Sequence, residues 1–249
     1  MYEAVCAHPV GESTVRRHAD TAASLGFDGV VVRNPPERRP APSAPEGGYD
    51  PDGYGGDGEI DVVSGVELAP EGVSSAGGRI SNLREQYTIL LVRGGTPALN
   101  RFAAEEPMVD VLADPMAGEG DVNHVIVRAA AENDVRVEFD LGAVLRTDGG
   151  PRVQALRGLR KLRELVEKYE VPFVVSASPR SHLQLRAPRE LFAVGETIGF
   201  EREQIRAGLE EWGHLAARNR ERLSEEFVAP GVRKGRYERD SERATEGGE

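Results

Sequence analysis

The chain has 249 residues, of which 39% are hydrophobic, and a formal net charge of −11. This length suits a single α/β barrel and is ample for a sizeable core. No apolar run approaches the roughly 20 residues that a membrane span needs, and the first ten residues lack the pattern of a signal peptide. The single cysteine, Cys6, excludes an internal disulfide and a cysteine-rich zinc site. We therefore expect a soluble, cytoplasmic protein.

The charged residues have an unusual composition. Arginine supplies 28 of the 31 basic residues, and acids number 42. An acidic excess with little lysine predicts a halophilic source, because carboxylates keep the surface hydrated and salt screens their mutual repulsion. A GC-rich codon bias is the alternative, but it explains the scarcity of lysine and not the acidic excess. The charge is also uneven, with 25 acids and 12 bases in residues 1–150 but 17 acids and 19 bases in residues 151–249.

Apolar, β-branched runs alternate with helical patterns along the chain. The first helix begins after Ser13 or Thr14 and ends at Leu25, with Gly26 just beyond it. Later helices are expected from Asn123, from about Pro151 to Tyr169, over 190–200 with a turn, and over 201–223. The expected strands are 2–7, 29–33, 60–68, 88–93, 109–113, 135–139 and 172–176.

Strands that alternate with helices predict a parallel sheet with helical crossovers. An open doubly wound sheet is one solution, but a closed TIM-like (β/α) barrel suits the number and length of the strands better. No eighth strand is evident, so we predict a seven-stranded or irregular barrel over residues 1–228. Residues 35–59 contain six prolines and six glycines and predict a disordered insertion. Residues 229–249 predict a disordered tail.

Most signatures of catalysis are missing from the sequence. No glycine-rich phosphate loop follows a strand, and there is no nucleophile elbow. Cys6 is expected to be a small buried residue of a strand. The segment AHP (7–9) resembles the first metal motif of the polymerase-and-histidinol-phosphatase phosphoesterase barrels, but Val10 stands where that family has a second histidine. We therefore predict no metal site, and keep a metal-dependent phosphoesterase as the alternative function.

Four acids lie at the ends of predicted strands: Glu67, Asp114, Glu138 and Asp140. Glu138 and Asp140 are two residues apart, so both point to the same side of an extended strand. Such a pair can serve acid–base catalysis or bind a metal. It can equally pair with an inward-facing arginine of a neighbouring strand. Ion pairing is favoured here, because no second motif completes a catalytic constellation.

The segment SASPRSHLQLRAPREL (176–191) places three arginines and one histidine just past a predicted strand. Residues 171–223 resemble RNase P protein component 3, a subunit family of archaeal and eukaryotic RNase P. The resemblance rests on a strand that runs into Ser176-Ala177-Ser178, on Arg186-Ala187-Pro188, and on two helices, the first of which ends near Gly199. The segments DVLADPM (110–116) and NHVIVRAAAENDVRVEFDL (123–141) are similar to the strand, helix and strand of that family. The insertion at 35–59 and the near absence of lysine depart from its pattern.

This resemblance implies a TIM-like barrel and a subunit of ribonuclease P, the endonuclease that removes the 5′ leader of precursor tRNA. The catalytic groups would belong to the RNA and its Mg²⁺ ions, so the chain would supply no catalytic residue and bind no cofactor of its own. It would lower the Mg²⁺ requirement and stabilise the active RNA fold. The implied partners are RNase P RNA, a small αβ protein subunit bound directly as a heterodimer or heterotetramer, other RNase P proteins and, indirectly, precursor tRNA. No membrane is implied.

RNA affinity comes largely from basic side chains that neutralise phosphates, and arginine adds a planar fork that binds phosphate and stacks on bases. Loops that follow barrel strands are where such folds build their sites, so Arg180 and Arg186 are the leading RNA contacts. The alternative for each arginine is a solvated surface or a carboxylate partner. For the helix 151–169 we expect a solvated face. Further candidates are Ser178 and His182, which would donate to phosphate or cap the turn, and Arg33, Arg84 and Arg93.

Overall fold

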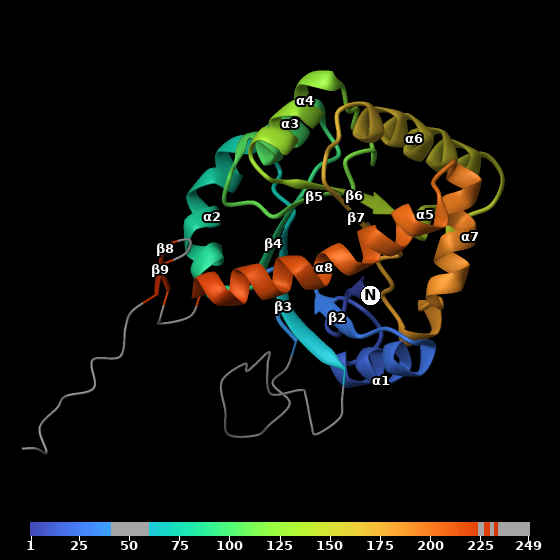
Figure 1. Cartoon of the computed structure of the whole chain (residues 1–249), viewed down its shortest axis with the longest axis horizontal. Helices are drawn as coiled ribbons and strands as arrows, with labels where there is room; N and C mark the ends of the chain where they lie inside the picture. Colours follow the sequence, from blue (N-terminus) through green and yellow to red (C-terminus); the bar gives the residue numbers. More distant parts are fainter. Residues whose placement is uncertain (41–59, 224–226, 230–231, 234–249) are drawn as a thin grey trace, which may run out of the picture.

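The computed structural model describes residues 1–40, 60–223, 227–229 and 232–233. Seven parallel strands pair in chain order and curve into a nearly closed barrel, with helices around it (Figure 1). The predicted seven-stranded TIM-like barrel is confirmed, and each strand end lies within two residues of the prediction. The strands are β1 (Tyr2–Val5), β2 (Gly29–Val32), β3 (Asp61–Leu68), β4 (Ile89–Arg93), β5 (Val111–Ala113), β6 (Arg136–Asp140) and β7 (Phe173–Ser176).

Two of the predicted helices, those that follow Thr14 and Asn123, begin at the capping residues that the sequence pattern singled out. Thr14 caps the first helix through a bond from the Arg17 amide, and Gly26 ends it in the left-handed conformation, at φ 89°. Asn123 caps α4 through its side-chain oxygen. The helices are α1 (Val15–Leu25), α2 (Val73–Gln86), α3 (Pro97–Glu105), α4 (His124–Glu132), α5 (Gly142–Arg146), α6 (Gly149–Lys168), α7 (Pro188–Ile198) and α8 (Arg202–Leu223).

Two short features accompany the barrel. The 3₁₀ turn η2 (His182–Gln184) lies between β7 and α7. Strands β8 (Phe227–Ala229) and β9 (Val232–Arg233) form an antiparallel pair after α8. Most of the expected insertion, 41–59, and most of the expected tail lie outside the described residues. Among those that are described, no helix is long and apolar enough to cross a membrane.

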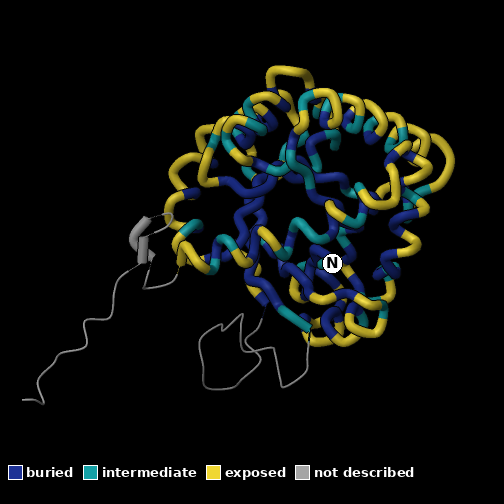
Figure 2. The backbone as a smooth tube through the Cα atoms, in the orientation of Figure 1, coloured by how far each residue is buried: buried dark blue, intermediate teal, exposed yellow. Residues whose placement is uncertain are grey.

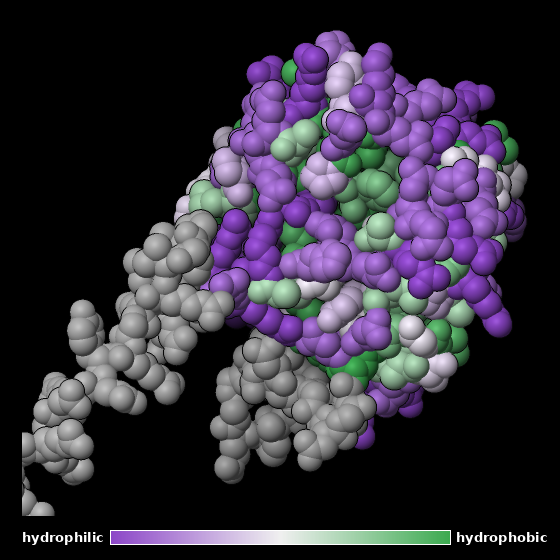
Figure 3. Space-filling model, in the orientation of Figure 1, coloured by the Kyte–Doolittle hydropathy of each residue, from purple (hydrophilic) through white to green (hydrophobic). Residues whose placement is uncertain are grey.

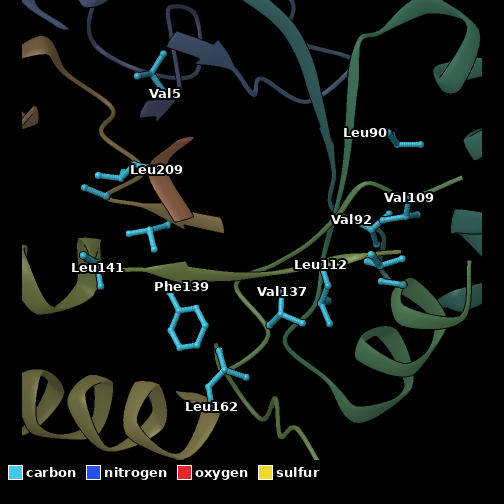
Figure 4. Close-up of a cluster of buried hydrophobic side chains, with 14 of the residues drawn as sticks. Val5, Leu90, Val92, Val109, Leu112, Val137, Phe139, Leu141, Leu162 and Leu209 are labelled. Carbon is cyan, nitrogen blue, oxygen red and sulfur yellow. The ribbon is translucent and has the colours of Figure 1, made fainter. Parts of the chain in front are cut away.

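Alternate strand residues point to opposite sides of the barrel wall, and this divides the buried hydrophobic residues into two clusters. The outward-facing set packs under the helices, as Figure 4 shows for Val92, Val137 and Phe139 of the wall and Leu162 of α6. The strands are buried within a shell of partly exposed helices (Figure 2). The inward-facing set fills the barrel and includes Ala4, Val31, Val63, Ile89, Leu91, Val111, Ala113 and Val174.

Helix α8 closes the amino-terminal mouth of the barrel (Figure 1). Trp212 is fully buried among the inward-facing residues, and its indole nitrogen donates to the Val175 carbonyl at 2.8 Å. Asn219, also buried, donates to the Thr88 carbonyl at 2.9 Å and to the Asp110 carboxylate at 2.8 Å. Because Thr88 and Asp110 precede β4 and β5, these bonds fix α8 over the strand beginnings.

Strands β1 and β7 meet at a seam that has no backbone ladder among the described residues. Glu3 bridges this seam and is fully buried. Its Oε1 accepts from Ser176 Oγ at 2.7 Å, from the Ala177 amide at 3.0 Å and from the Ala4 amide at 3.0 Å. Burial raises the pKa of Glu3 to about 7, although the Ser176 and Ala177 bonds oppose the shift. The carboxyl group therefore holds a proton under mildly acidic conditions.

Candidate nucleic-acid interface

Charged side chains fill the carboxyl-terminal end of the barrel. Arg33, just after β2, is only 2% exposed. Its Nε donates to Glu67 at 2.7 Å, and its two Nη groups donate to the two oxygens of Glu138, one of them at 3.0 Å. A further bond of 3.0 Å joins Arg33 Nη1 to Ser178 Oγ. Burial alone would lower the pKa of Arg33, but Glu138 and Glu67 raise it well above its ordinary value.

The ion pair of Glu138 agrees with the structural alternative, which paired Glu138 and Asp140 with an inward-facing arginine. Asp140 differs, because its Oδ1 accepts from the Gly142 amide at 2.7 Å. The ion pairs of Arg33 also enclose its guanidinium, which has almost no surface left for a ligand. The sequence-based candidacy of Arg33 as an RNA contact therefore has no support in this geometry. Its position instead links β2 to β3, to β6 and to the loop after β7.

Arg93 ends β4, and its side chain is about half exposed at the rim of the same mouth, at 49%. Its Nε donates to Glu67 Oε1 at 2.5 Å, while Glu67 Oε2 accepts from Arg33. Burial would raise the pKa of Glu67, but these two arginines lower it. The Glu67 carboxylate thus joins the buried guanidinium of Arg33 to the half-exposed one of Arg93. Among the described residues, the Nη groups of Arg93 have no hydrogen-bond partner and are available to a ligand.

The loop after β7 carries the two leading candidates, and both are held by backbone carbonyls. Exposed Arg180 donates from Nη2 to the Val10 carbonyl at 2.7 Å. Half-buried Arg186 donates from Nη1 to the carbonyls of Leu183 at 3.2 Å and Leu185 at 2.9 Å. Neither arginine belongs to an ion pair within the part of the chain that the structure describes. Each guanidinium is therefore oriented, and no carboxylate competes for it.

Ser178 and His182 hold this loop in place. Ser178 has φ 45°, in the left-handed region that non-glycine residues rarely adopt, and Arg33 and Ser176 bond to it there. His182 donates its amide to Ser13 Oγ at 3.0 Å, and its Nδ1 lies 2.8 Å from the same hydroxyl. Of the two roles considered for these residues, the geometry favours fixing the turn over donating to phosphate.

Arg84 lies at the other end of the barrel. It stands in the last turn of α2, pairs with Asp110 and donates to the Tyr87 carbonyl at 2.9 Å. Helices in this fold end where the next strand begins, so a residue at a helix carboxyl terminus lies at the amino-terminal mouth. The structure therefore separates Arg84 from Arg93, Arg180 and Arg186.

Arg146 is a basic residue at the carboxyl-terminal mouth that the sequence analysis did not single out. It ends α5, the short helix after β6, and its side chain is exposed. Its Nη1 donates to the Ala177 carbonyl at 2.7 Å, and its Nη2 lies 3.5 Å from the Ser178 carbonyl. Its place soon after a predicted strand was the one available signal, and the short helix that carries it has no clear periodicity.

The residues considered for metal binding do not come together. In the described ranges, no three or more histidine, cysteine, aspartate or glutamate side chains are grouped as they would be around a metal ion. His8 is exposed in the loop after β1. Cys6 is 8% exposed, and burial raises the pKa of its thiol, as expected for an unreactive residue.

Comparison with known proteins gives consistent matches over almost the whole chain. A family model described as RNase P subunit p30 matches residues 1–224. Ribonuclease P protein component 3 of Halobacterium salinarum is 60% identical over 240 residues, which cover 96% of this chain and all of that protein. The protein of the same name from Halorubrum lacusprofundi is 53% identical with the same coverage.

The fold also occurs in a solved structure. A chain of archaeal ribonuclease P, determined by cryo-EM with mature tRNA, matches 96% of this chain and 100% of its own length, with a TM-score of 0.79 and 22% identity. These comparisons give no support to the metal-dependent phosphoesterase alternative. The extent of the family match and the identity to its members show that this chain belongs to the RNase P subunit p30 family.

Proposed function

We propose that the chain is a protein subunit of RNase P and supports RNA-catalysed removal of the 5′ leader from precursor tRNA. The observation that carries this proposal is the 60% identity, over 96% of the chain, to a ribonuclease P protein component 3. The structural neighbour comes from an RNase P solved with mature tRNA, so RNase P RNA and other RNase P proteins are the expected partners. Direct binding to a small αβ subunit and a cytoplasmic location are parts of the same proposal.

The chemistry of cleavage is assigned to the RNA and to Mg²⁺ ions that it holds. Two of the four strand-end acids, Glu67 and Glu138, are already engaged, because they neutralise the buried Arg33. A carboxylate that is paired in this way is a poor general base and a poor metal ligand. The chain therefore contributes binding and positioning to the reaction.

Contact with RNA is assigned to the carboxyl-terminal mouth, through Arg180, Arg186 and Arg93. Each of these guanidinium groups is oriented by one or two bonds to the protein and keeps further N–H donors for a phosphate oxygen. In high salt the gain from releasing counter-ions is small, so directional hydrogen bonds carry more of the affinity. Ser178 and His182 act by holding the loop.

We expect the double substitution Arg180→Ala with Arg186→Ala to lower precursor-tRNA cleavage by a reconstituted holoenzyme at limiting Mg²⁺. A hydrogen bond from a charged group is worth about 1.5–3 kcal/mol, so the loss should reach about tenfold or more. Far-UV circular dichroism should not change. The matched control replaces Arg152 and Arg157 by alanine, since both are exposed on α6 and neither has an ion pair in the described ranges. Normal cleavage by the first variant would contradict the assignment of this loop.

The function itself is tested by recovering the tagged chain from native extract and sequencing the bound RNA. RNase P RNA should be enriched, whatever the details of the surface. Recovery of the chain without that RNA would contradict the proposal.

A further inference from the structure

We propose that Arg146 is an additional RNA contact, and that it forms one composite basic surface with Arg93 and Arg180. This inference rests on the proposed function, because it adds a residue from a second loop to the same end of the barrel. The expected ligand is the phosphate backbone of RNA. An acidic segment of a partner protein is the alternative ligand, which the experiments below distinguish.

The conformation of Arg146 supports a binding role. Its side chain is exposed, and it makes no ion pair in the part of the chain that the structure describes. Its Nη groups are directed onto the Ala177 and Ser178 carbonyls, at 2.7 and 3.5 Å. These bonds leave the Nε–H and the remaining Nη hydrogens unused. An arginine held in this way loses little side-chain entropy when it meets a phosphate.

The packing around α5 favours this conformation of the Arg146 side chain. A Cβ atom at Gly142 would overlap the Arg146 guanidinium and would lie 2.6 Å from the Ala177 carbonyl oxygen. The glycine therefore lets the first turn of α5, the arginine side chain and the loop after β7 approach closely. This contact fixes Arg146 relative to the loop that carries Arg180.

Hydrogen bonds, together with the backbone from residue 178 to residue 180, link the three arginines. Arg93 shares Glu67 with Arg33, and Arg33 bonds to Ser178 Oγ, while the Ser178 carbonyl faces Arg146. Two residues further on, Arg180 lies on the Val10 carbonyl of the loop after β1. Residues from the ends of six strands, β1 to β4, β6 and β7, thus form one connected unit, which is a suitable template for a rigid, extended ligand.

The first test measures salt dependence. We expect Arg146→Ala to reduce precursor-tRNA cleavage by the holoenzyme. It should also make the slope of log K, for binding of the chain to RNase P RNA, against log[KCl] shallower by roughly 0.7–0.9 per lost phosphate contact. Arg146→Lys should restore the slope because it keeps the charge. The control Arg157→Ala, on exposed α6, should leave the slope unchanged. Reduced activity with an unchanged slope in Arg146→Ala would mean that the residue only supports the loop, and would overturn the proposal.

The second test locates the RNA directly. Cys6 is buried, so a cysteine introduced on the surface can carry an iron chelate that cleaves nearby RNA by hydroxyl radicals. Tethers at Ala143→Cys on α5 and at Leu183→Cys, where the leucine is 76% exposed on η2, should both cut RNase P RNA. The control tether is Gln154→Cys on α6. RNA cleavage from the tether at residue 143 would show that RNA, and not an acidic protein segment, lies beside Arg146.

The outcomes separate the two proposals. If the tether at 183 cuts and the tether at 143 does not, the role of Arg146 is overturned and the RNase P assignment stands. If the wild-type chain recovers no RNase P RNA from extract, the proposed function fails and the inference fails with it.

Discussion

Two buried ionisable residues, Arg33 and Glu3, offset the free-energy penalty of desolvation in different ways. Arg33 keeps its charge, because Glu67 and Glu138 surround it. Among the residues that the structure describes, Glu3 has no cation beside it at the seam, and its Oε2 has no hydrogen-bond partner. A buried carboxyl group without a cation is most stable in its neutral form. The first residue stabilises the barrel as an ion, and the second stabilises it as an acid.

The pKa of Glu3 predicts a stability that falls as pH rises. In the unfolded chain the carboxyl ionises near its ordinary value of 4.5, whereas in the fold it does so at about 7. The stabilisation is therefore full below pH 4.5 and is lost as pH rises to 7, by about 3 kcal/mol in total. Glu3→Gln, which cannot ionise, should remove this dependence. Urea unfolding of both proteins in high KCl between pH 5 and pH 8 measures the difference.

Subtracting the free energy of unfolding of the Glu3→Gln variant from that of the wild-type chain also cancels the pH-dependent contribution of His18. Burial and the nearby His182 lower the pKa of His18 to about 4, so its contribution to stability is lost as pH falls from 6.5 towards 4. This effect has the opposite sign and is common to both proteins. The prediction would be contradicted if the difference in free energy of unfolding between the wild-type chain and Glu3→Gln stayed constant from pH 5 to pH 8.

At the level of residues, the sequence predicted correctly at which end of the barrel some residues of the candidate site lie. Arg180 and Arg186 follow a strand, and the topology alone puts them at the carboxyl-terminal mouth. Arg84 comes just before the predicted strand 88–93, so its place at the opposite mouth could also be inferred. The burial of Arg33 was not, because its partners lie 34 and 105 residues away along the chain. Arg146 was missed because its helix has only five residues.

Among the elements, the strands were easier to predict than the helices. Strands of a parallel barrel are buried on both faces, so they appear as continuous apolar runs that need no periodicity. Helix α2 was not predicted because it contains Gly77 and Gly78, which weaken any helical pattern. Helix α3 was not predicted either, although Thr96 caps it and Pro97 lies in its first turn.

Helix α8 closes one end of the barrel, and its attachment predicts a large effect of one substitution. Trp212→Ala should lower the free energy of unfolding by about 3–5 kcal/mol, since it leaves a cavity and frees the Val175 carbonyl. Leu223→Ala on the same helix, where the leucine is 44% exposed, should change it by less than about 0.5 kcal/mol. Urea unfolding followed by far-UV circular dichroism compares them. A loss below about 1 kcal/mol for the tryptophan variant would argue against α8 as the closing element.

For the whole molecule, surface charge sets the conditions of folding. The visible outer faces of the helices are mostly hydrophilic, and hydrophobic side chains show mainly between them (Figure 3). The haloarchaeal origin of the relatives at 60% and 53% identity is consistent with the acidic composition. Repulsion among acids grows as the Debye length rises from about 3 Å at 1 M salt to about 10 Å at 0.1 M.

Ordered structure should therefore be lost as KCl falls from molar concentration to about 0.1 M. Far-UV circular dichroism during a KCl titration measures this, with NaCl at equal ionic strength as the control for an ion-specific effect. A spectrum that stays fully folded in low salt would contradict adaptation to high salt.

The buried ion pairs respond to salinity differently from the surface. Acids outnumber bases by 11 in this chain, so part of the outer negative charge must be balanced by cations dissolved in the surrounding solution, and dialysis can remove those. Glu67 and Glu138 have a counter-ion that is covalently part of the chain, because it is the guanidinium of Arg33. No dilution of the medium can take it away. The surface of the molecule therefore depends on dissolved salt, whereas the buried ion pairs at the carboxyl-terminal end of the barrel do not. On removal of salt, the outer helices should lose their ordered structure before these buried pairs separate.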